Sequence, residues 1–374
     1  MTFCKSHCIS YLEANPCLGG FCFMEISVFD LQKFVTATTP QTRKAASLPV
    51  LLGFLTHGHV HIINHGIDRD LGMRALRGWR KYADLPNHAA DSRPDTHYQV
   101  GVSGETGTET AQDGAEGKKD HKLFYFFNPH DELGIPDELR DMFPALMARN
   151  HWPLETPDTK FKTPLMEYGQ GLQFVAEVLI RAFAVALDLP ETFFLSLLEH
   201  APHKSRPLFY RPIPKGQEEN LTWGGAHMDV NVLTLLGYEL WIDEDGAESY
   251  SPPDEHGGLW IQDTATGQLT RPDNRPEGAL TGQVGMMLEV LTGGYVKATS
   301  HTIVPPQVSG YSRAMMAHFM HMNLLQLVAP MRHFSTPESL RHYGPPIIAG
   351  TFLLKILQEI GLAPGAIKKL GFQY

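Results

Sequence analysis

Hydrophobic and polar positions divide the chain into a helical first half and a strand-rich second half. Apolar residues recur at helical spacing over residues 163–187, and a second amphipathic helix is predicted over 70–85. A further helix is expected over 190–198, after Pro190. The stretch AASLPVLLGFLTHGHVHIINHG predicts a helix, a turn at Gly58 and then a strand. We therefore expect a helical layer in the first half.

After about residue 205 the pattern changes to short apolar runs separated by Gly, Pro, Asp and Asn. The runs are PLFYRPI, NVLTLLGY, GGLWIQD, GQVGMMLEVL and RAMMAHFMHM. This pattern is typical of an all-β sandwich or barrel. An earlier strand is predicted at HKLFYFF, and two helical stretches, 337–343 and 347–361, close the chain. The polar stretch over 101–120 predicts a mobile surface loop.

The first 23 residues contain the only four cysteines of the chain, Cys4, Cys8, Cys17 and Cys22. Their spacing departs from the paired C-x2-C pattern of most zinc sites. A disordered extension is the favoured interpretation, with a zinc knot that includes His7 or a pair of disulfides as alternatives.

Composition narrows the class of protein. The chain has 374 residues, 43% of them hydrophobic, and a formal net charge of −10, so we expect a globular protein without nucleic-acid partners. Apolar runs are shorter than the roughly 20 residues that span a bilayer, so no membrane association is expected. The first residues make a poor signal peptide, which predicts a cytoplasmic location.

The stretch WGGAHMDVNVLTLLGYE places His227 and Asp229 at the start of an apolar run. Residues two apart on a strand point to the same face, so both side chains can reach one metal ion. A strand end with two satisfied polar side chains is the alternative, because H-x-D triplets are common. His57, His59 and His61 also alternate, but they are interpreted as one polar face of a strand.

A third ligand is expected further along the β region. The candidates are His256, His301, His318 and His321. Two histidines and one carboxylate on one face of a metal are typical of non-haem Fe(II) oxygenases. Arg313 follows on an inward strand face, where a guanidinium requires an anion such as a dicarboxylate.

Several segments in order resemble the isopenicillin N synthase-like family of Fe(II)- and 2-oxoglutarate-dependent dioxygenases. They are HGHVHIINHGI, NHWP, LFYRPIP, AHMDVNVLTLL, GGLWIQD and GMMLEVLTGGYVKATSH, followed by Arg313. The resemblance covers nearly all of the chain after Met24.

The resemblance implies a mainly β fold with flanking helices, built on a double-stranded β-helix (jelly roll, cupin-like). It implies an N-terminal α/β region over 24–200, the oxygenase core over 201–335 and a C-terminal helical tail over 336–374.

For the site, the resemblance implies that His227, Asp229 and His301 bind Fe(II). It also implies that Arg313 and Tyr210 hold the distal carboxylate of the co-substrate 2-oxoglutarate, and that O2 reacts at the metal. The expected activity is the hydroxylation, desaturation or cyclisation of a small organic substrate by a monomer or homodimer.

The chain departs from the family at two positions near this site. Met315 stands where a serine is usual after the arginine, and Leu208 replaces a common asparagine. The missing hydroxyl removes one hydrogen bond, worth roughly 1 kcal/mol. An Fe(II) oxidase of the same family that works without 2-oxoglutarate therefore stays an alternative, beside a non-catalytic protein on this fold and a zinc hydrolase.

Overall fold

Two β-sheets and a layer of helices make up the part of the protein that the computed structural model describes. The described residues are 25–104, 118–131, 134–156, 160–263, 266–272 and 274–369. The large sheet has nine strands, eight of them in the order β1 (Val28–Asp30), β2 (His59–Ile63), β13 (Leu280–Val284), β9 (Leu233–Ile242), β15 (Ser312–Met320), β6 (Lys204–Tyr210), β5 (Lys122–Phe126) and β3 (Gly101–Ser103). The ninth, β10 (Glu248–Ser249), pairs with β9.

The second sheet has four antiparallel strands, in the order β12 (Leu269–Thr270), β11 (Gly258–Gln262), β14 (His301–Val304) and β8 (Gly224–His227). Two short pairs complete the strands: parallel β4 (Lys119–Asp120) with β7 (Leu221–Thr222), and antiparallel β16 (Leu327–Val328) with β17 (Ile347–Ile348).

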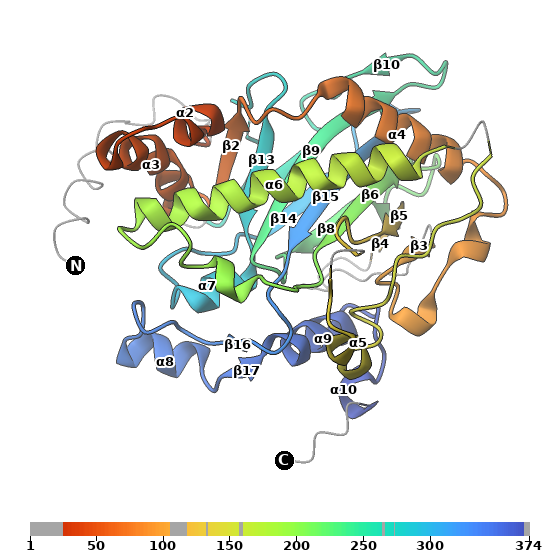
Figure 1. Cartoon of the computed structure of the whole chain (residues 1–374). Helices are drawn as coiled ribbons and strands as arrows, with labels where there is room; N and C mark the ends of the chain where they lie inside the picture. The colour runs from red at the N-terminus through yellow and green to blue at the C-terminus, as the bar shows by residue number, and fades with distance from the viewer. Residues whose placement is uncertain are drawn as a thin grey trace.

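The helices lie mainly outside the sheets. They are α2 (Leu31–Val35), α3 (Pro40–Thr56), α4 (Arg69–Ala83), α5 (Asp137–Met142), α6 (Lys162–Ala186), α7 (Met286–Leu291), α8 (Pro337–Tyr343), α9 (Ala349–Glu359) and α10 (Ala366–Lys369). Short 3-10 turns lie at His88–Asp91, Pro94–Thr96 and Leu195–Leu197. Figure 1 shows α6 crossing the face of the large sheet, with α8, α9 and α10 gathered at one end of the molecule.

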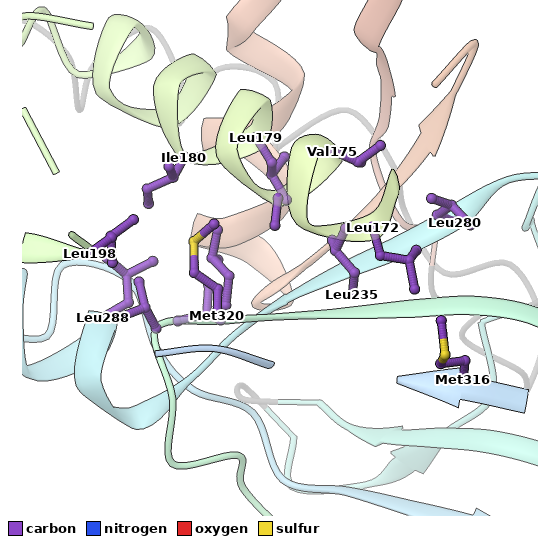
Figure 2. Packing of buried hydrophobic residues seen from close by; sticks show 14 of the residues in the cluster. Leu172, Val175, Leu179, Ile180, Leu198, Leu235, Leu280, Leu288, Met316 and Met320 are labelled. Carbon is purple, nitrogen blue, oxygen red and sulfur yellow. The ribbon is translucent and has the colours of Figure 1, made fainter. Parts of the chain in front are cut away.

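Strand β15 shows why both faces of the large sheet are apolar. Successive side chains of a strand point to opposite faces. Met316 and Met320 face α6, where they join Leu172, Leu179 and other side chains of the main core (Figure 2). Met315 and Ala317 face the other way.

Met315 and Ala317 belong to a second core that lies between the two sheets. Trp223, Trp241 and Ile303 join them there, contributed by both sheets. Two sheets packed around such a core form the predicted jelly roll, and the fold class is confirmed.

Most predicted elements are present close to their expected bounds. The helix over 163–187 is α6, the helix over 70–85 is α4, and the helix over 337–343 is α8. The turn between α3 and β2 contains Gly58 at φ +69°, a backbone conformation that glycine adopts without strain.

Three local predictions were wrong. The run MMLEVL forms helix α7 and not a strand, and the helix over 190–198 is reduced to turns and the 3-10 segment Leu195–Leu197. The predicted loop over 101–120 begins with strand β3 and ends with β4, because both ends pair with neighbouring strands. Most of that loop, like the cysteine-containing segment over 1–23, lies outside the described residues.

The large sheet draws strands from both sides of residue 200. Strands β1, β2, β3 and β5 precede that position, and β5 pairs directly with β6. The N-terminal region therefore supplies four strands of the large sheet.

Candidate metal centre and active site

Two histidines lie side by side on adjacent strands of the small sheet. His227 at the end of β8 pairs directly with His301 at the start of β14, and their rings lie 4.4 Å apart. Asp229 follows two residues after His227. One ligand atom from each of the three residues lies within 4.8 Å of the others. The structure therefore brings together all three predicted iron ligands.

Backbone carbonyls orient both imidazoles. His227 Nδ1 lies 2.7 Å from the Gly225 carbonyl oxygen, and His301 Nδ1 lies 3.3 Å from that of Thr299. A carbonyl oxygen only accepts hydrogen bonds, so each Nδ1 carries a proton, and Nε2 is the ring nitrogen left to face a metal.

The Asp229 carboxylate is fixed by two donors on neighbouring strands. Thr234 Oγ1 donates to Oδ2 at 2.6 Å, and Gln283 Nε2 donates to the same oxygen. Asn231 in turn donates to Thr234 Oγ1 at 3.0 Å. These contacts occupy Oδ2, whereas Oδ1 faces His227 Nε2 at 3.7 Å.

The protonation states of the cluster suit a metal. Burial and the neighbouring His227 lower the pKa of His301, which keeps its imidazole neutral. Burial alone would raise the pKa of Asp229, but His301, His227 and the Thr234 hydroxyl lower it, so its carboxylate is ionised. Two imidazoles and one carboxylate are the donor set that non-haem Fe(II) prefers.

Arg313 and Tyr210 lie opposite each other on β15 and β6. Arg313 is 1% exposed, and its Nε donates to Glu239 Oε2 at 3.0 Å. Glu239 also accepts from Arg275 Nη1 at 2.6 Å. The protein itself thus supplies an anion for Arg313, and the sequence interpretation missed it.

Part of the Arg313 guanidinium still lacks a partner. Its Nη1 is buried without a hydrogen bond within the described residues. A carboxylate oxygen fits such a donor. Tyr210 lies beside it, 5.4 Å from its ring centroid to the guanidinium carbon, and stacks on Trp223. The co-substrate roles of both residues stay predictions.

Curated relatives cover most of the chain, although no protein-family model matches it. The 2-oxoglutarate-dependent dioxygenase ecdK of Aspergillus rugulosus is 27% identical over 336 residues, which is 83% of this chain and 92% of that protein. A 2-oxoglutarate-Fe(II) type oxidoreductase of Aspergillus fumigatus is 28% identical over 264 residues, which is 67% of this chain and 69% of that protein.

The fold of the chain is also similar to that of solved 2-oxoglutarate-Fe(II) oxygenases. A 2OG-Fe(II) oxygenase family protein from Caulobacter crescentus matches with a TM-score of 0.71 and 25% identity, over 90% of this chain and 99% of that one. Neurospora crassa T7H in complex with alpha-KG matches with a TM-score of 0.70 and 22% identity, over 88% and 95%. The His-Asp-His cluster lies on the fold that these proteins share.

The chain is similar to Fe(II)- and 2-oxoglutarate-dependent dioxygenases over most of its length.

A cavity opens beside the His-Asp-His cluster. Its lining includes the predicted ligands His227 and Asp229, and the basic side chains of Lys122, Lys204 and Arg206. Helix α9 contributes an apolar wall. The described lining does not include Arg313 or Tyr210, and Tyr210 belongs to the core between the two sheets.

The other histidines considered in the sequence analysis lie outside the His-Asp-His cluster. His256 is exposed, and His318 is buried between Ser205 and Gln173, at 2.9 and 2.7 Å. His321 lines the cavity. His59 is buried, with its ring 6.5 Å from that of His301, so the strand β2 turns its polar face inward and not to solvent.

The sequence analysis did not predict that Gln283 and Thr234 contact Asp229, or that Glu239 contacts Arg313. Thr234 lies five residues after Asp229, close enough for the motif to have included it. Gln283 and Glu239 lie on β13 and β9, and their contacts depend on strand register, which no local pattern encodes.

Proposed function

We propose that this dioxygenase hydroxylates, desaturates or cyclises a small organic substrate. Fe(II) would be held by His227, Asp229 and His301, and the distal carboxylate of 2-oxoglutarate by Arg313 and Tyr210. The observation that carries the proposal is that one potential ligand atom from each of the three residues lies within 4.8 Å of the others, while the Nδ1 atom of each histidine lies near a backbone carbonyl.

The residues of the chain would position the reactants and exclude water. When bound, iron and 2-oxoglutarate supply the oxidising power that activates O2. Thr234 and Gln283 hold the Asp229 carboxylate in one orientation. The apolar cavity wall formed by α9 would keep water from the reacting C–H bond.

We also propose a cytoplasmic location, and a monomer or homodimer without nucleic-acid or membrane partners. The net charge of −10 supports the exclusion of nucleic acid. By length and composition alone, α6 is apolar enough to cross a membrane, but 67% of its most apolar window is buried in the fold. Packing against the sheet accounts for its apolar character.

The first test is the visible spectrum of the anaerobic protein with Fe(II), with and without 2-oxoglutarate. Chelation of ferrous iron by the keto acid gives a metal-to-ligand charge-transfer band, which we expect in the wild type. His227→Ala and His301→Ala should lose iron and the band. Arg313→Ala should keep iron but require about 10- to 100-fold more 2-oxoglutarate, because it loses a charged hydrogen bond.

The surface variant Arg149→Ala serves as a control, because that side chain is 69% exposed. If iron binds without the band at any 2-oxoglutarate concentration, the co-substrate part of the proposal is wrong. If iron fails to bind the wild type, the metal centre itself is wrong.

A further inference from the structure

Glu239 on strand β9 lies between two arginines. Its Oε2 accepts a hydrogen bond from Arg313 Nε at 3.0 Å, and its Oε1 accepts one from Arg275 Nη1 at 2.6 Å. Trp241, two residues further along β9, donates its Nε1 to Oε2 at 3.1 Å. Both oxygens of this carboxylate therefore already have donors from the protein itself.

The three charged residues carry more positive than negative charge. Burial alone would raise the pKa of Glu239, but Arg313 and Arg275 lower it to about 2, so its carboxylate is ionised. Both guanidinium groups are charged at any physiological pH. In the described part of the chain, Glu239 is the one carboxylate within salt-bridge distance of either arginine. One positive charge of this cluster is therefore left without an anion.

The two arginines differ in the donors that they have left. Arg275 donates from Nε and Nη2 to the Ala279 carbonyl oxygen, at 3.1 and 2.8 Å, and from Nη2 to that of Gly237 at 3.1 Å. Arg313 is 1% exposed, and its Nη1 is buried without a hydrogen bond within the described residues. The donor that still requires an acceptor is therefore on Arg313.

Arg275 decides how much of the Glu239 charge acts on Arg313. With Arg275 in place the carboxylate is shared, and Arg313 keeps an attraction for a further anion. Without Arg275 the Glu239–Arg313 pair would be neutral, and an approaching carboxylate would meet the like charge of Glu239 without a compensating cation. The affinity of Arg313 for a carboxylate therefore depends on a second arginine.

We propose that Arg275 is a positioning residue for the co-substrate and acts through Glu239. It draws the Glu239 carboxylate away from Arg313 and so leaves Arg313 Nη1 to pair with the distal carboxylate of 2-oxoglutarate. This assignment rests on the proposed function and adds to it a residue from outside the His-Asp-His cluster.

The test compares 2-oxoglutarate with 2-oxopentanoate on the anaerobic protein loaded with Fe(II). The two keto acids share the chelating group and the chain length, but 2-oxopentanoate has a methyl group in place of the distal carboxylate. Titration of the charge-transfer band gives both dissociation constants. We expect the wild type to bind 2-oxoglutarate about 10- to 100-fold more tightly, as charged hydrogen bonds give.

Arg275→Gln should reduce this preference about tenfold, because Arg313 is then neutralised by Glu239. The loss should come from weaker binding of 2-oxoglutarate, with the affinities for 2-oxopentanoate and iron unchanged. Arg275→Lys keeps the positive charge and should keep most of the preference.

The double variant Arg275→Gln/Glu239→Gln separates positioning from mere support of the fold. It removes the anion as well as the second cation, so Arg313 again has a positive charge without a partner, and the preference should return. A residue that only supports the fold predicts the opposite, because the second substitution removes a further ion pair. Arg77→Gln is the matched control, since it breaks a partly exposed pair with Glu248 and should leave both affinities unchanged.

Three results would overturn the proposal while the proposed function stands. They are an unchanged preference in Arg275→Gln, an equal weakening of both keto acids in that variant, and a double variant with no more preference than the single one. A wild type that binds iron but gives no band with either keto acid would contradict the co-substrate part of the proposed function, and the role of Arg275 with it.

Discussion

At the scale of single residues, the metal centre depends on a side chain that is not a ligand. Gln283 donates to Asp229 Oδ2 and lies 3.5 Å from His301 Nε2. Gln283→Leu removes this donor and frees the carboxylate to rotate. We expect the iron dissociation constant to rise about 10- to 100-fold, as changes next to metal ligands usually do. Competition with a coloured chelator under anaerobic conditions measures it.

The exposed Gln262 on β11 provides the control, and Gln262→Leu should leave iron affinity unchanged. Equal iron affinity in wild type and Gln283→Leu would mean that Thr234 alone holds Asp229. In that case Thr234→Val should produce the loss instead.

The sequence was sufficient to identify the three side chains that converge in the structure, but not the residues around them. His227 and Asp229 are two apart on one strand, so their common direction is a local property. Glu239 escaped prediction because it meets Arg313 only through the pairing of β9 with β15. An inward arginine correctly indicated an anion, but that anion is part of the protein.

At the scale of elements, α6 holds the large sheet through one apolar stripe. Leu179 is fully buried in this stripe and packs over Gly282 of β13, where an added Cβ would meet its methyl group (Figure 2). Leu179→Ala should lower the free energy of unfolding by about 2–5 kcal/mol, because it leaves a cavity in the core. Urea unfolding followed by circular dichroism measures the change.

Phe174 on the same helix is the matched control. Its side chain is 56% exposed, so Phe174→Ala should change stability by less than about 0.5 kcal/mol. A Leu179→Ala variant no less stable than Phe174→Ala would show that α6 is not a principal support of the sheet.

Helices with a polar face were predictable, whereas the short apolar run MMLEVL was not. Buried and exposed residues recur at helical spacing in α4, so its pattern distinguishes a helix from a strand. The run MMLEVL is equally compatible with a strand and with a buried helix, and its tertiary contacts select α7. The order of the nine strands could not be predicted, because most neighbours in the sheet are distant in sequence.

At the scale of the whole molecule, the Glu239 ion pairs link the stability of the fold to pH. Burial alone would raise the pKa of Glu239, but Arg313 and Arg275 lower it to about 2. Because the folded pKa lies below the unfolded value of 4.5, this carboxylate stabilises the fold above pH 4.5. That stabilisation, about 3 kcal/mol, is lost as the pH falls from 4.5 toward 2.

Glu239→Gln isolates this contribution, since glutamine has the shape of a protonated glutamate. The variant should be less stable than the wild type by about 3 kcal/mol near neutral pH, and the difference should shrink toward zero in acid. Urea unfolding of the metal-free protein across this pH range measures the stability difference and its dependence on pH, without interference from iron release.

Glu248→Gln is the control. It removes a more exposed ion pair with Arg77 and should lower the free energy of unfolding by at most about 1 kcal/mol at neutral pH. A stability difference for Glu239→Gln that stays constant down to the lowest pH would show that the two arginines do not hold Glu239 ionised.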